Sequence, residues 1–197
     1  SAIYEITFQD PSKPATVLLY SERGDINAKE KKVAASQRLS RNMSIFFSGE
    51  FDVQLEQTGI LQDGKISQEL NAEGRNICAA VRFPAGTKKV CFRYGISLIS
   101  AEQAEKNLQR EQGSAFNLAK VAADGRKEWN ETLSNIMVEG GTEDEKTVLY
   151  TSYYRTFERP VCLSEDGQYF SVFDGEVHKD NGQPFYTDDW IWDTYRA

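Results

Sequence analysis

The change of periodicity that decides the fold lies in KVCFRYGISLISAEQAEKNLQRE, residues 89–111. From Lys89 to Ile99 apolar residues cluster in a short run, which predicts a β-strand. Ser100 and Gln103 then fit a capping box, in which each side chain satisfies an amide that the first helical turn leaves unpaired. Good helix formers occupy Ala101 to Glu111. The sequence therefore predicts β structure before Ser100 and a helix directly after it.

Upstream of this point the chain consists of short apolar runs bounded by turn formers such as Asp63-Gly64 and Pro84-Ala85-Gly86. The basic run from Lys29 to Lys32 is predicted to be a solvated loop. This spacing predicts antiparallel sheets packed as a sandwich, and not βαβ units. The predicted strands are Ala2–Phe8, Thr16–Tyr20, Met43–Phe47, Phe51–Gln57, Ile77–Phe83 and Lys89–Ile99.

Downstream the period becomes helical. A second helix is predicted from apolar residues at spacings of three and four, namely Leu118, Val121, Ala122, Trp129, Leu133 and Ile136. Thr142 and Glu145 form a second capping box, and the third helix that starts there should end at Pro160. Its aromatic stripe, with Tyr153 and Phe157, is predicted to pack against neighbouring helices. A small hairpin is expected around residues 168–173.

These patterns define an α+β chain in three predicted parts. Residues 1–99 form a partial antiparallel β-sandwich, and residues 100–141 form a helical connector. Residues 142–197 form the start of a helical domain that we expect to continue beyond Ala197, because chain ends rarely consist of aromatic residues without a polar tail.

Charge and hydropathy exclude some classes of partner. The formal net charge of −7 argues against nucleic acid, which is bound through clustered Lys and Arg. No apolar stretch approaches the roughly 20 residues of a membrane span, and residues 1–197 carry no signal-peptide pattern.

The cysteines and the single histidine do not show metal-site spacing. Cys78, Cys91 and Cys162 are interpreted as structural, with a Cys78–Cys91 bridge left open. His178 lies in a polar segment without a second His or Cys nearby, which favours a surface histidine.

The last eight residues, WIWDTYRA, combine aromatic rings, a carboxylate and a guanidinium. Such groups stack on sugar rings and hold hydroxyls, although aromatic residues also serve simply as core packing. Asp188 and Asp189 could cap a helix here, which would place Asp189 and Asp193 on one face. Two carboxylates on one face cannot easily straddle a sugar ring, so Asp193 is expected to hold substrate.

A set of motifs in this order resembles glycoside hydrolase family 92, the calcium-dependent exo-acting α-mannosidases. The motifs are Gly95-Ile96-Ser97-Leu98-Ile99-Ser100, Glu102-Gln103-Ala104, Asn107-Leu108, Trp129-Asn130, Val138-Glu139-Gly140-Gly141-Thr142, Tyr150-Thr151 and Trp192-Asp193-Thr194-Tyr195-Arg196-Ala197. The resemblance is strong over residues 95–197 and only general before them.

The resemblance implies a fold of β-sandwich, helical connector and (α/α)6 barrel, of which this chain would cover the middle. It implies a bacterial enzyme, secreted, periplasmic or on the cell surface, that hydrolyses terminal α-mannosides with inversion, α-1,2 linkages among them. The catalytic acid, the base and the calcium ligands would lie beyond Ala197. Asp193 and Trp192 would bind the mannose-containing glycan, and the remaining catalytic domain of the same polypeptide would be the chain's partner.

Two rival interpretations remain at this stage. The chain could be a non-catalytic carbohydrate-binding or interaction module whose terminal aromatic residues form a complete binding platform. It could also be a purely structural sandwich. The enzyme fragment is the interpretation that accounts for the ordered motifs, and by itself it should be inactive.

Overall fold

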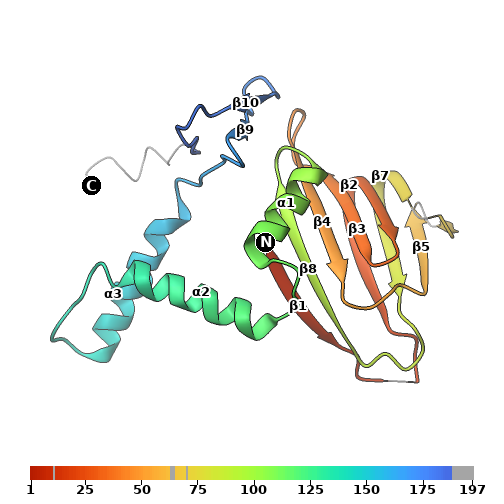
Figure 1. The fold of residues 1–197 in the computed structure, drawn as a ribbon, viewed down its shortest axis with the longest axis horizontal. Helices are drawn as coiled ribbons and strands as arrows, with labels where there is room; N and C mark the ends of the chain where they lie inside the picture. The colour runs from red at the N-terminus through yellow and green to blue at the C-terminus, as the bar shows by residue number, and fades with distance from the viewer. Residues whose placement is uncertain (11, 63–64, 70, 188–197) are drawn as a thin grey trace. The chain divides into compact units, whose positions relative to one another are not determined.

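A computed structural model of the chain describes residues 1–10, 12–62, 65–69 and 71–187. Within these residues the strands before Ser100 form one antiparallel sheet in the order β1-β8-β4-β3-β2-β7-β5-β6 (Figure 1). They are β1 (Ala2–Thr7), β2 (Thr16–Lys29), β3 (Lys32–Arg38), β4 (Ser44–Phe51), β5 (Gln57–Gln62), β6 (Lys65–Ser67), β7 (Asn71–Arg82) and β8 (Lys89–Ser97). The predicted fold class, a partial antiparallel sandwich followed by helices, is confirmed.

One face of the sheet carries the hydrophobic core. Phe51 on β4 is fully buried and stacks on Phe92 of β8, with ring centroids 4.2 Å apart. It also meets the Phe83 ring edge-on at 5.0 Å, so side chains far apart in the sequence share one cluster. The buried members of this core are Ala15, Ile26, Ala28, Val33, Phe51, Leu55, Ile60, Ile77, Ala79, Val81, Phe83, Val90 and Phe92.

The opposite face carries helix α1 (Ala101–Gln112), which lies across β8 and β4 (Figure 1). Gly95 permits this close approach, because a Cβ at that position would lie 2.3 Å from the carbonyl oxygen of Ala104. The helix begins as predicted, with Ser100 Oγ accepting a hydrogen bond from the Gln103 amide at 3.1 Å. The sheet thus has a core on one side and a docked helix on the other.

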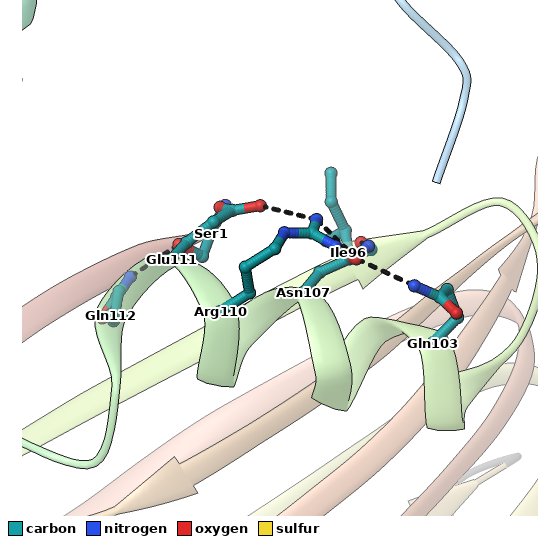
Figure 2. A network of polar contacts seen from close by, with 7 residues as sticks. All are labelled: Ser1, Ile96, Gln103, Asn107, Arg110, Glu111 and Gln112. Carbon is teal, nitrogen blue, oxygen red and sulfur yellow. Dashed lines mark hydrogen bonds and ion pairs between the residues drawn. The ribbon is translucent and has the colours of Figure 1, made fainter. Parts of the chain in front are cut away.

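Polar side chains fasten α1 to the sheet (Figure 2). Asn107 Nδ2 donates to the Ile96 carbonyl at 3.0 Å, and Asn107 Oδ1 accepts from Gln103 Nε2 at 3.1 Å and from Arg110 at 2.8 Å. Buried polar groups need such partners, because an unpaired one costs stability. The network therefore specifies where α1 lies on β8.

The sheet with α1 and residues 170–178 is one compact unit, and the remaining residues from Ala119 onward are a second. In the second unit α2 (Leu118–Leu133, whose first residue belongs to the first unit) precedes α3 (Glu143–Arg155) and the short 3₁₀ helix η1 (Thr156–Glu158). The capping box of Thr142 and Glu145 is present as predicted. The predicted domain limits at residues 99 and 141 stay a prediction.

The aromatic members of the predicted α3 stripe make ring contacts, and η1 supplies one of them, whereas Val148 and Leu149 of the same stripe are exposed. Trp129 of α2 lies 4.5 Å from the ring of Tyr154 and 5.7 Å from that of Phe157, while Tyr153 lies 5.3 Å from Phe157. Ile136 follows the end of α2, and its carbonyl accepts from the Tyr150 hydroxyl at 3.0 Å. The expected hairpin is also present, as β9 (Gln168–Phe170) paired with β10 (Val177–Lys179).

Candidate glycan-binding site

The residues predicted to bind substrate, Asp193 and Trp192, lie outside the described residues, as do Asp188 and Asp189. The structure therefore neither brings them together nor separates them. What it does describe is the segment that leads to them, up to Thr187.

This approach segment is held by antiparallel pairing with residues 161–163. The Thr187 amide donates to the Val161 carbonyl at 2.9 Å, and the Val161 amide donates to Thr187 Oγ1 at 2.8 Å. Cys162 and Tyr186 form an isolated β-bridge, and the Leu163 amide donates to the Phe185 carbonyl at 2.7 Å. Residues 185–187 are thus held on both sides of the Cys162–Tyr186 bridge.

An aromatic pair supports the same segment. The rings of Tyr169 and Phe185 stack with centroids 4.1 Å apart and planes inclined by 9°. The Phe185 amide donates to Ser164 Oγ at 2.9 Å. These contacts hold the chain two residues before Thr187.

His178 is a partly exposed residue of β10. Its Nε2 atom lies 2.8 Å from Asp174 Oδ2. A hydrogen bond from the Glu176 amide lowers the pKa of Asp174, with smaller contributions from Ser171 and His178, against the opposing effect of desolvation. Asp174 and His178 thus contact each other across the turn between β9 and β10, and the exposure of His178 agrees with the predicted surface histidine.

The three cysteines are free. Cys78 lies on β7 and Cys91 on β8, and the strands β2, β3 and β4 lie between them. Adjacent strands are about 4.8 Å apart, whereas a disulfide requires Cα atoms within about 7 Å. The bridge left open by the sequence is therefore ruled out by strand order.

In the part of the chain that the structure describes, no cluster of three or more His, Cys, Asp or Glu side chains is arranged to hold a metal ion. Within the same residues, none of the helices has a long enough apolar stretch to cross a bilayer.

Two features of the polar interior have no counterpart in the sequence-based predictions. Arg93 lies in an apolar strand and is fully buried, and Gln103 and Asn107 are buried at the interface of α1 with the sheet. The sequence signal for this polar interior is a charged residue, Arg93, inside an apolar run. A second signal is the pair Gln103 and Asn107, which are four residues apart and so share a helix face.

Comparison with known proteins explains the motifs. Residues 103–197 match the model of the glycosyl hydrolase family 92 catalytic domain. Over 98% of its length the chain is similar to a solved structure, the family GH92 inverting mannosidase BT2199 from Bacteroides thetaiotaomicron, with 27% identity and a TM-score of 0.86. Residues 103–197 are therefore part of a glycoside hydrolase family 92 catalytic domain.

Other family 92 structures share the fold. The α-mannosidase BT3965 from Bacteroides thetaiotaomicron, in complex with mannoimidazole, is 21% identical over 98% of the chain, with a TM-score of 0.82. The glycosyl hydrolase ccman5 is 18% identical over 96% of the chain, with a TM-score of 0.83. No curated protein gave a match. The chain spans 28% of the length of BT2199 and of BT3965, and 27% of that of ccman5.

Proposed function

We propose that the protein carrying this chain is an α-mannosidase that hydrolyses terminal α-mannosides of glycans, α-1,2 linkages among them, with inversion at the anomeric carbon. The observation that supports this most directly is the match of residues 103–197 to the family 92 catalytic domain. The 27% identity to an inverting mannosidase supports the same chemistry.

In this proposal Asp193 and Trp192 hold the substrate. A carboxylate accepts hydrogen bonds from sugar hydroxyls, and an indole ring packs against the apolar face of the sugar. Inversion requires an acid and a base on opposite sides of the bond, with carboxyl groups roughly 6.5–9.5 Å apart. We assign these two roles to residues beyond Ala197.

Calcium is proposed as the cofactor of the whole enzyme. Since the described residues contain no carboxylate cluster that fits a metal, they offer no calcium site. Calcium prefers six to eight oxygen ligands, so its ligands are proposed to come from the remaining catalytic domain. That domain is also the proposed partner of the helical unit, whose apolar side chains Val148 and Leu149 are exposed in this chain.

The proposed setting is a secreted, periplasmic or cell-surface enzyme of a bacterium. A mannose-containing glycan outside the cytoplasm would be its substrate, and neither nucleic acid nor a membrane span is part of the proposal. The net charge of −7 accords with an uncharged ligand.

The test compares the 197-residue chain with a longer polypeptide that includes the rest of the catalytic domain. With α-1,2-mannobiose and calcium, the longer polypeptide should release mannose that NMR first detects as the β-anomer, and a chelator should abolish turnover. The 197-residue chain should show no turnover. Release of α-mannose first, activity in chelator, or hydrolysis by the short chain would each contradict the proposal.

Substrate holding is tested by Asp193→Asn in the longer polypeptide. Loss of one charged hydrogen bond should lower kcat/KM by about 10- to 100-fold. The matched control is Asp144→Asn, an exposed residue of the first turn of α3, which should leave kcat/KM unchanged. Titration of the 197-residue chain with mannobiose tests the rival interpretation. A complete carbohydrate-binding module should bind the disaccharide, whereas a chain that supplies only part of a binding pocket should not.

A further inference from the structure

Arg93 is the bulkiest of the fully buried side chains among the described residues. It lies on β8 and faces α1. A guanidinium carries five N–H donors and remains charged at every relevant pH, so its burial requires partners on several sides. Those partners come from two different parts of the chain.

The first partner lies in the sheet. Arg93 Nε donates to Glu50 Oε1 at 2.7 Å, and Nη2 pairs with the same oxygen. Glu50 is the cross-strand neighbour of Arg93 in the β4–β8 ladder. This pair is therefore set by the register of the sheet.

The second group of partners lies after α1. Arg93 Nη1 donates to the carbonyl oxygen of Gly113, the residue that ends the helix. The guanidinium carbon lies 4.8 Å from the centre of the Phe116 ring, a cation–π contact. Gly113 and Phe116 belong to residues 113–117, the connection between α1 and α2.

We propose that Arg93 is a positioning residue that fixes the connection 113–117 to the sheet, and so fixes the point at which the chain leaves the sheet for α2. The carbonyl groups at a helix end lack hydrogen-bond donors within the helix, and Arg93 supplies a donor to the carbonyl of Gly113. Its planar fork reaches Glu50 and Gly113 at once, which a lysine cannot do. The proposal concerns the fold and holds whether or not mannoside hydrolysis is established.

Helix α1 itself is held by other contacts. Gly95 lets the helix approach β8 closely, Leu108 is buried against the sheet, and Asn107 donates to the Ile96 carbonyl. Removing the Arg93 side chain should therefore release residues 113–117 while α1 remains docked. This difference separates the positioning role from general stabilisation.

The experiment measures backbone NMR order parameters of the 197-residue chain for residues 101–108 and 113–117. Arg93→Met should lower the order parameters of residues 113–117 from about 0.85 to below about 0.6, and should leave those of residues 101–108 near about 0.85. The matched control is Lys32→Met. Lys32 faces Glu50 from β3 and binds Glu105 at 2.5 Å, so its loss should leave residues 113–117 unchanged.

Two further variants decide the outcome even if Arg93→Met does not fold. Arg93→Lys keeps the charge beside Glu50 but loses the fork, so the order parameters of residues 113–117 should again fall below about 0.6. Phe116→Ala removes only the ring and should lower the order parameters of residues 114–117. Wild-type order parameters in either variant, or an equal decrease in residues 101–108 and 113–117, would overturn the proposal.

Discussion

The sheet and the two helices α2 and α3 bury their apolar residues very differently. In the sheet, Phe51, Ile77 and Val81 are completely buried. In α2 and α3, every residue of which the structure describes, no side chain is fully buried, and Val148 is 67% exposed. Most helix stability in proteins comes from packing of an apolar face. The sheet therefore carries its own core, whereas α2 and α3 depend on a few aromatic contacts and α3 also on its Thr142 cap.

The largest expected effect compares an aromatic residue from each region. Phe51→Ala should lower the free energy of unfolding of the sheet by about 4 kcal/mol, because it removes a fully buried ring. Trp129→Ala, at a residue 39% exposed, should cost the helical unit only about 1 kcal/mol. Urea unfolding with segment-resolved hydrogen exchange measures both. Equal losses would show that the helices have a core of their own.

Two glycines sharpen the same comparison. Gly95→Ala should destabilise the sheet unit by about 3 kcal/mol, because the new Cβ would lie 2.3 Å from the Ala104 carbonyl oxygen. Gly125→Ala is the matched control in α2, where a Cβ meets nothing within 4 Å. It should stabilise the helix by about 0.8 kcal/mol. Thermal unfolding of the two variants should shift in opposite directions, and a shared direction would contradict this account.

The two helix N-caps should respond differently to the loss of one hydroxyl. Thr142→Ala and Ser100→Ala each remove a cap worth about 1 kcal/mol. In α3 this loss should reduce helix content, whereas α1 should stay helical because it is docked on the sheet. Far-UV circular dichroism with hydrogen exchange of each helix tests this, and melting of α1 in Ser100→Ala would refute it.

The smallest effect is a dependence of α3 on pH. Hydrogen bonds from the Thr142 amide and hydroxyl lower the pKa of Glu145 below its ordinary value of 4.5. A carboxyl group with a lowered pKa stabilises the fold above its unfolded pKa, and this contribution is lost as pH falls through the folded pKa. Helicity of α3 should therefore decline below about pH 4.5.

The control for this prediction is Glu145→Gln, which can still cap the helix but cannot titrate. Hydrogen exchange of α3 between pH 5 and pH 3, corrected for intrinsic rates, should show a smaller pH response in this variant than in the wild type. An identical response in both would mean that another group controls the acid sensitivity.

Local signals predicted the helices better than the strands. The starts at Ser100 and Thr142 are correct because a cap depends on residues three positions apart. The strand β3, with the sequence KVAASQR, was not predicted, and β2 runs to Lys29, well beyond the predicted end at Tyr20. Such small and polar residues become strand because neighbouring strands bind their backbone on both sides.

The sequence by itself determined the α+β class, the helix starts and the family 92 motifs, since each depends on neighbours along the chain or on an ordered set of residue types. Only the tertiary structure decided the order of the strands, the separation of Cys78 from Cys91 and the burial of Arg93 between Glu50 and Gly113. The contacts of Arg93 join residues 20 and 43 positions apart, and the pairing of β1 with β8 joins Ala2 to Tyr94, 92 positions away. Their pairing depends on long-range packing and sheet register, and short-range patterns do not encode either of these.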